Sequence, residues 1–189
     1  AKNFGRSFEI KNTYSFRVGS ISKPITAAAI LSLIEKKKWD LDTRVNTILV
    51  DLKIPESVTI RNLLNQTSGA IYEFSHDIKT EEEFRAALKA MPWNKPGKWV
   101  YSNIGYQILG LVVTEISKQP LYSYIEKDVF PKLAQNRAVN LVQGTSNDCG
   151  NLSSISNNPF YDVGSGGIIT TPEVIADFFM ALNENKIII

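Results

Sequence analysis

The most informative stretch of the chain reads Ser20-Ile21-Ser22-Lys23-Pro24-Ile25-Thr26-Ala27-Ala28-Ala29-Ile30-Leu31. Ser20 and Lys23 are three residues apart, close to one helical turn, so the hydroxyl and the amine can meet on one face. Pro24 suits the first turn of a helix, where no N–H donor is needed. The residues after it are apolar on nearly every side. The stretch therefore predicts a buried helix that presents Ser20 at its N-terminal end.

The spacing of Ser20 and Lys23 has two interpretations. A hydroxyl at the positive end of a helix dipole, with an amine beside it, can be activated as a nucleophile without histidine. The alternative is an ordinary helix cap and a solvated lysine, since chance alone gives a Ser-x-x-Lys pair about once in a chain of this size. The pair stands where the chain enters the core, which adds weight to the first interpretation. On this segment alone both stay open.

Composition excludes several classes of function. The chain has 189 residues, 43% hydrophobic and 21% charged, with a net charge of +2, so we expect one globular domain over residues 1–189. Basic residues are scattered among acidic ones, so nothing points to nucleic acid. No apolar stretch is long enough for a transmembrane segment, and residues 1–6 lack the apolar core of a signal peptide.

The chain has one histidine, His76, and one cysteine, Cys149. This count excludes the usual His/Cys zinc site and an internal disulfide, and we expect no metal and no cofactor. A Ser-His-Asp triad would have to use His76, and the sequence contains no Gly-x-Ser-x-Gly elbow, so a triad is disfavoured. No activating residue lies near Cys149, which we interpret as an incidental thiol in a turn.

Further elements are predicted from periodicity and turn residues. A second polar pair, Tyr101 and Asn103, precedes an apolar helix that starts at Ile104, where both residues also fit ordinary capping and packing. The other expected elements are strands at residues 8–10 and 14–18, a short helix at 59–64, a helix that starts with a capping box of Thr80 and Glu83, and a helix that starts near Pro172.

Four segments together resemble the serine β-lactamase-related family, in the branch of class C β-lactamases, D-alanyl-D-alanine carboxypeptidases and related esterases. They are residues 16–24, 63–69, 96–106 and 166–171, in the family's order and spread over nearly the whole chain. The resemblance implies an α+β fold of the β-lactamase/transpeptidase-like type. Such a fold has two lobes, a helical lobe and an antiparallel sheet with flanking helices, which meet at Ser20.

The resemblance also implies roles for four residues. Ser20 is the expected acylated nucleophile, Lys23 its base or proton relay, Tyr101 the phenol of a second motif, and Asn103 a ligand of the substrate amide. Neutral Lys23 or ionised Tyr101 must take the Ser20 proton, and the sequence leaves open which one does. The Ser20 N–H is expected to form half of an oxyanion hole, a contribution of about 3 kcal/mol per donor.

The expected function is that of a serine acyl hydrolase acting on an amide, β-lactam or ester carbonyl, with a peptidoglycan stem peptide, a β-lactam or a small ester as substrate. One alternative is a penicillin-recognising sensor that traps the acyl group, and another is an inactive scaffold. The family implies a location in the cell envelope, the periplasm or outside the cell.

Three features depart from the family pattern. Gln66 stands where members usually carry histidine, at a position expected to lie outside the nucleophilic machinery. The third motif, Lys or His followed by x-Gly, is absent, and residues 131–160 look shortened. The apolar triplet at residues 187–189 reads as the start of a strand, so we expect a domain truncated at both ends. We expect either a companion segment or another chain that supplies the missing C-terminal strands, or a fragment with little turnover and poor stability.

Overall fold

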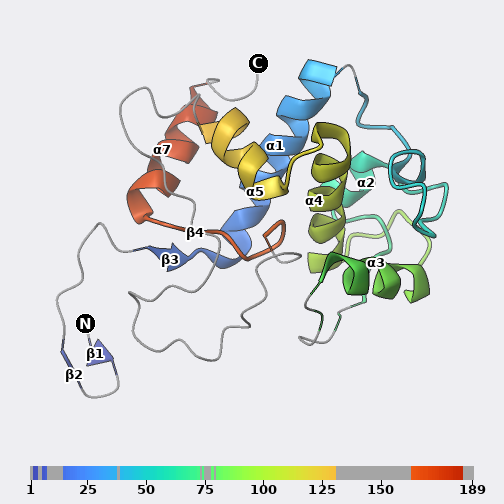
Figure 1. The fold of residues 1–189 in the computed structure, drawn as a ribbon, viewed down its shortest axis with the longest axis horizontal. Helices are drawn as coiled ribbons and strands as arrows, with labels where there is room; N and C mark the ends of the chain where they lie inside the picture. The colour runs from blue at the N-terminus through green and yellow to red at the C-terminus, as the bar shows by residue number, and fades with distance from the viewer. Residues whose placement is uncertain are drawn as a thin grey trace.

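The computed structural model describes residues 2–3, 6–7, 15–37, 39–72, 74, 78, 80–130 and 163–184. Within them, β1 pairs with β2 and β3 with β4, both antiparallel (Figure 1). In chain order the elements are β1 (Lys2–Asn3), β2 (Arg6–Ser7), β3 (Phe16–Arg17), the 3-10 turn η1 (Gly19–Ile21), α1 (Ser22–Lys37), the 3-10 turn η2 (Val45–Thr47), α2 (Ile60–Leu64), α3 (Glu81–Ala90), α4 (Asn103–Ser117), α5 (Leu121–Tyr124), the π-helical turn η3 (Ile125–Val129), β4 (Ile169–Thr170) and α7 (Pro172–Asn183).

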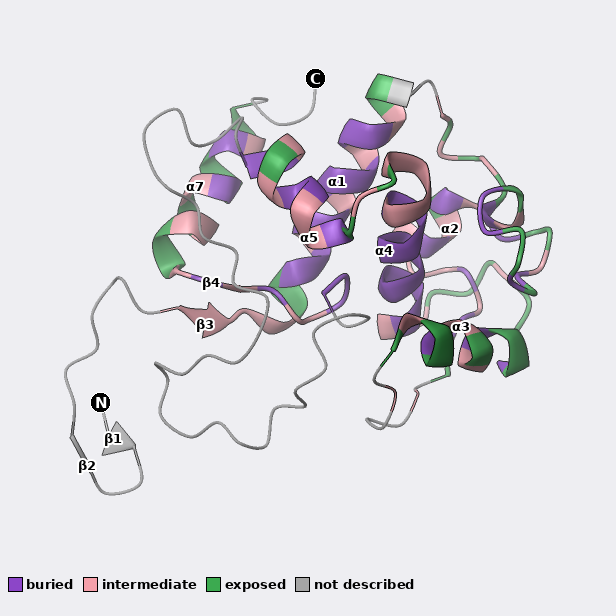
Figure 2. Cartoon of the chain, in the orientation of Figure 1, coloured by how far each residue is buried: buried purple, intermediate pink, exposed green. Residues whose placement is uncertain are grey.

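Helices α1 and α4 form the centre of the core. Helix α1 crosses the middle of the molecule, between α4 on one side and α7 on the other (Figure 1). Both central helices are buried along most of their length, whereas α3 exposes its outer face (Figure 2). Burying one Ile or Leu side chain contributes about 1.5–3 kcal/mol, so this packing is a rigid support for the residues at the start of α1 and α4.

The helix starts follow from capping residues in the sequence. The capping box predicted at Thr80 is confirmed: its hydroxyl accepts from Glu83 N–H, and the Glu83 carboxylate accepts from Thr80 N–H. Thr59 caps α2 in the same way, with Asn62 as its partner. Ser102 accepts from the N–H of residue 105 and starts α4. These caps fix where α2, α3 and α4 begin.

The sheet of β3 and β4 brings distant segments together. Phe16 lies opposite Thr170 and Arg17 opposite Ile169, so residues 163–170 run beside the start of α1. Strand β3 covers only part of the strand predicted at residues 14–18. No helix in the described part of the chain is long and apolar enough to cross a membrane. Several predictions lie outside the described residues: the strand at residues 8–10, His76, Cys149, the region 131–160 and the strand at residues 187–189.

Candidate active site

Ser20 lies in the turn η1, between strand β3 and helix α1. The backbone before the turn is fixed, because Val18 N–H donates to Ile168 C=O at 2.9 Å. Gly19 has a φ of 55°, a left-handed value that suits glycine, and it directs the chain into α1. Ser20 is therefore exposed at the N-terminal end of α1, as predicted, and Lys23 is buried in the first turn of that helix.

The four residues predicted for the site come together at this turn. Ser20 Oγ lies 2.5 Å from the Tyr101 hydroxyl oxygen and 3.3 Å from Lys23 Nζ. Lys23 Nζ also donates to Asn103 Oδ1 at 2.8 Å and lies 4.7 Å from the centre of the Tyr101 ring. The first two residues come from the start of α1 and the other two from the entry to α4. The packing of these two helices therefore sets the spacing of the site.

A backbone carbonyl that the sequence analysis did not predict also holds Lys23. Its Nζ donates to Ser165 C=O at 2.7 Å, so an ammonium group here has an acceptor for each of its three N–H donors. The Ser165 segment is itself tied to α1, because Thr26 Oγ1 donates to Gly164 C=O at 2.9 Å. A carbonyl carries no side-chain signature. Only the glycines around Ser165 could have pointed to this segment.

The pKa values of two tyrosines near Lys23 are shifted in opposite directions. Burial raises the pKa of the Tyr101 phenol, but hydrogen bonds with Lys23 and Ser20 and the charge of Lys23 outweigh it, so this pKa lies below its usual range. Burial and the nearby Tyr101 raise the pKa of Tyr106, whose hydroxyl donates to the carbonyl of residue 64 at 3.1 Å. Tyr101 is therefore the phenol that ionises more readily.

Gln66 contacts the residues on either side of Tyr101. These contacts involve none of the four residues predicted for the site. The Gln66 side-chain Oε1 accepts from Ser102 N–H at 2.8 Å, and its backbone carbonyl accepts from Val100 N–H at 2.9 Å. From the sequence, Gln66 is expected to lie outside the nucleophilic machinery, and no other role is predicted for it. Its type and position in the sequence give no signal of these contacts, and the one with Ser102 spans 36 positions of the chain.

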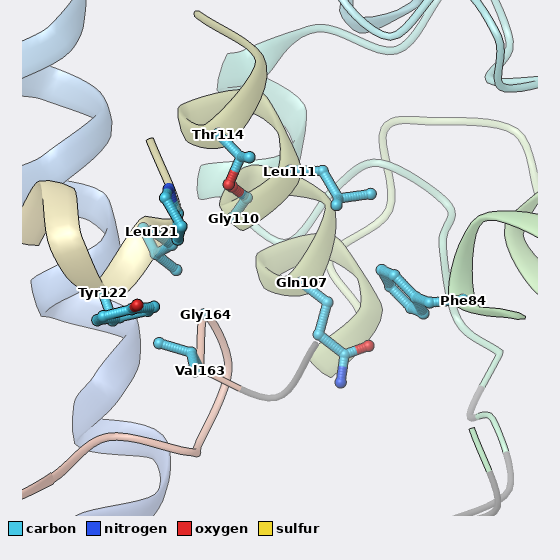
Figure 3. Close-up of a pocket in the computed structure, with 10 residues that line it drawn as sticks. Phe84, Gln107, Gly110, Leu111, Thr114, Leu121, Tyr122, Val163 and Gly164 are labelled. Atoms are coloured by element: carbon cyan, nitrogen blue, oxygen red, sulfur yellow. The ribbon is translucent and has the colours of Figure 1, made fainter. Parts of the chain in front are cut away.

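A pocket lies next to the site, between α4, α5 and residues 163–164 (Figure 3). Mostly apolar side chains line it, and neither Ser20 nor Lys23 is among them. Gln107 lines the pocket and its Nε2 donates to Ser165 Oγ at 3.3 Å. The pocket therefore borders the segment that holds Lys23.

Comparison with known sequences gives a family match over most of the chain. The family described as Beta-lactamase matches residues 11–188. PbpX of Bacillus subtilis (strain 168), which is named as a candidate penicillin-binding protein, is 31% identical over 144 residues, 72% of this chain and 37% of PbpX. A beta-lactamase of Providencia stuartii is 32% identical over 122 residues, 62% of this chain and 32% of that protein. The chain thus spans about a third of the length of these relatives.

Solved structures have the same fold. A penicillin-binding protein from Bacillus halodurans has a TM-score of 0.74 at 25% identity, over 94% of this chain and 63% of that one. The D-amino acid amidase from Ochrobactrum anthropi SV3 has a TM-score of 0.76 at 21% identity, over 95% and 58%, which is a likeness of fold alone. The predicted β-lactamase/transpeptidase-like fold is confirmed, and the match over residues 11–188 shows that the chain belongs to the beta-lactamase family.

Proposed function

We propose that this chain is part of a serine acyl hydrolase that forms an acyl-enzyme at Ser20 with an amide, β-lactam or ester carbonyl. The observation that carries the proposal is the contact of Ser20 Oγ with Tyr101 OH at 2.5 Å and with Lys23 Nζ at 3.3 Å. A serine hydroxyl is a weak nucleophile until a neighbour takes its proton, and both neighbours are within reach. Membership of the beta-lactamase family supports the same class of reaction.

Tyr101 is the proposed base. Ser20 Oγ lies 2.5 Å from the Tyr101 hydroxyl oxygen and 3.3 Å from Lys23 Nζ, so the phenol is the nearer proton acceptor. The Ser20 hydroxyl then donates to Tyr101, whose lowered pKa favours a phenolate that can accept this proton. In this scheme Lys23 stabilises the phenolate by its charge and keeps the serine oxygen in line.

The reaction then follows the usual course of acyl transfer. As Ser20 Oγ bonds to the carbonyl carbon, its proton passes to Tyr101 and the carbonyl oxygen becomes an oxyanion, to which Ser20 N–H donates. Tyr101 returns the proton to the leaving nitrogen or oxygen. Asn103 turns its Oδ1 to Lys23, which leaves its Nδ2 group to donate to a substrate carbonyl. A water, deprotonated by Tyr101, then hydrolyses the ester at Ser20.

The proposed substrates all present such a carbonyl: a peptidoglycan stem peptide cleaved by D,D-carboxypeptidase action, a β-lactam, or a small ester. We place the reaction in the cell envelope or outside the cell, because peptidoglycan lies there.

The test is a time course with a chromogenic β-lactam and a chromogenic ester, followed by intact-protein mass, on the chain and on its Ser20→Ala variant. Repeated product release that disappears in the variant is the expected result. Release of a single equivalent followed by a lasting adduct would favour an acyl-trapping sensor over a hydrolase. Neither product nor adduct with any probe would contradict the proposal and favour an inactive scaffold.

A further inference from the structure

The two residues that flank Tyr101, Val100 and Ser102, both donate their backbone N–H to Gln66. Val100 N–H donates to the Gln66 carbonyl at 2.9 Å, and Ser102 N–H donates to Gln66 Oε1 at 2.8 Å. Ser102 uses only its backbone N–H for this contact, because its hydroxyl donates to Ala70 C=O. Gln66 therefore holds the backbone N–H groups of the two residues that flank Tyr101.

The conformation of Gln66 is adapted to this double contact. Its φ is 62°, in the left-handed region that few residues with a side chain adopt. Such values persist where the surroundings enforce them, and they concentrate at functional sites. Here the surroundings are a ladder between two irregular segments: Gly97 N–H donates to Thr67 C=O at 2.9 Å and Asn94 N–H to Gly69 C=O at 3.0 Å. The Gln66 contacts lie at the end of this ladder nearest Ser20.

Tyr101 has few other restraints. Its side chain is 47% exposed, so packing alone does not fix the ring, and residues 100–102 lie in neither a helix nor a strand. Ser20 and Lys23 contact the phenol itself, but a proton acceptor must be held in place before the reaction starts if it is to react efficiently. The backbone on both sides of Tyr101 has to supply that restraint.

We propose that Gln66 is a positioning residue whose carbonyl and side-chain oxygen together hold the Tyr101 phenol against Ser20 and Lys23. This inference rests on the proposed function for its effect on acylation, but its effect on the phenol is independent of any substrate. Gln66 acts through Tyr101 and touches no reacting atom.

The test compares two substitutions of nearly equal length. Gln66→Met removes the acceptor oxygen, and Gln66→Glu keeps one at the same reach. A displacement of about 1 Å can lower a rate on the order of 10²-fold, so we expect Gln66→Met to slow acylation of Ser20 by a chromogenic β-lactam at least about tenfold. Gln66→Glu should react faster than Gln66→Met, even though its charge opposes formation of the phenolate.

A second readout needs no substrate. The Tyr101 phenol is titrated by its phenolate ultraviolet absorbance, with Tyr101→Phe subtracted. Gln66→Met should move this titration to higher pH, because the phenol is less firmly held beside Lys23. Thr80→Ala removes the cap of α3, whose hydrogen bonds join Thr80 and Glu83 and are separate from this ladder, and is the control for general loss of stability. It should leave both the titration and the acylation rate unchanged.

The possible outcomes distinguish a failure of the positioning role of Gln66 from a failure of the proposed function. Unchanged titration and acylation in Gln66→Met would overturn the positioning role, as would equal acylation by the Glu and Met variants. If Gln66→Met does not fold, Gln66→Asn replaces it, because asparagine tolerates the left-handed conformation but its shorter side chain cannot reach Ser102. A wild-type chain that is never acylated would refute the proposed function, and the phenol titration would still decide the role of Gln66.

Discussion

Lys23 is the residue on which the geometry of the site depends most. Its side chain reaches from the first turn of α1 to three oxygen atoms, those of Ser20, Asn103 and Ser165, at 2.7–3.3 Å. These acceptors come from three separate parts of the chain, so a shorter or differently shaped side chain cannot replace this one. A buried ammonium is stable only when such partners surround it. Lys23 therefore links the structural core to the proposed chemistry.

Removing the amine of Lys23 or the hydroxyl of Tyr101 should slow the reaction strongly and preserve the fold. We expect Lys23→Ala and Tyr101→Phe each to lower the acylation rate of Ser20 by about 10²–10⁴-fold, the usual contribution of a positioned acid or base. Stopped-flow acylation by a chromogenic β-lactam, together with circular dichroism, measures both properties.

The controls for these variants are Lys98→Ala, at an exposed lysine, and Tyr72→Phe, at a tyrosine whose 49% exposure matches the 47% of Tyr101. Both should retain the wild-type rate. A Tyr101→Phe variant with an unchanged rate would exclude this phenol as the base.

The lowered pKa of Tyr101 makes a prediction about stability at alkaline pH. In the unfolded chain a phenol ionises near about pH 10, whereas in the folded chain Tyr101 ionises at lower pH. Its ionisation therefore adds stability as the pH rises through the folded value, and the full contribution is present above the unfolded value. Urea unfolding between neutral pH and about pH 10 should show a growing loss of stability in Tyr101→Phe relative to wild type.

Tyr106 provides the opposite case for the same experiment. Its pKa is raised, so the folded chain opposes ionisation, and the loss of stability in Tyr106→Phe should stay nearly constant up to about pH 10, where the unfolded phenol ionises, and shrink above it. If the stability difference between wild type and Tyr101→Phe stays constant between neutral pH and about pH 10, the lowered pKa of Tyr101 is contradicted.

Residue types predicted the side chains of the site but not its backbone partners. Ser20, Lys23, Tyr101 and Asn103 could be named because their side chains carry chemistry in a recognisable spacing. The contribution of Ser165 is a carbonyl oxygen, which every residue has, so sequence alone cannot select it. Gln66 was visible as a departure from the family pattern, but its contacts depend on a turn that only the folded chain defines.

At the scale of elements, the site exists where the starts of two buried helices meet the segment before β4. The starts of α2, α3 and α7 were predictable because Thr59, Thr80 and Pro172 are local signals. The contact between residues 163–168 and α1 was not predictable from local signals, since it joins positions more than a hundred residues apart. The short strands β3 and β4 likewise depend on each other and carry little periodicity of their own.

Alanine substitutions at two glycines test the contact between residues 163–168 and α1. A Cβ at residue 164 would lie 2.4 Å from Tyr106 O, so Gly164→Ala must displace the segment that holds Lys23. At residue 105, in α4, a Cβ would find ordinary contacts of 3.6 Å or more, and alanine is the better helix former by about 1 kcal/mol.

We expect Gly164→Ala to lower both the free energy of unfolding and the acylation rate, and Gly105→Ala to leave the rate unchanged with equal or higher stability. Urea unfolding and stopped-flow acylation check the two results. A Gly164→Ala variant that acylates at the wild-type rate would show that this segment does not hold Lys23 in its reactive position.

At the scale of the whole molecule, the described residues form one helical core whose central helices present the site. The family match extends over residues 11–188, and the chain spans about a third of the length of its curated relatives. Sequence predicted the fold class because four separated segments agreed with one family. The arrangement of helices around α1 could not be derived from periodicity, because α1 is apolar on nearly all sides and so does not indicate which face meets which neighbour.

Peptide mass mapping, after the folded chain is labelled with a β-lactam or an acyl-phosphonate, identifies which serine is acylated. Among the serines near the site, Ser20 is exposed and contacts both a phenol and an amine, whereas Ser22, Ser68 and Ser165 are buried. We expect a single adduct, on the peptide that contains Ser20, and no adduct in Ser20→Ala. An adduct on Ser22, Ser68 or Ser165 with Ser20 unmodified would contradict this expectation.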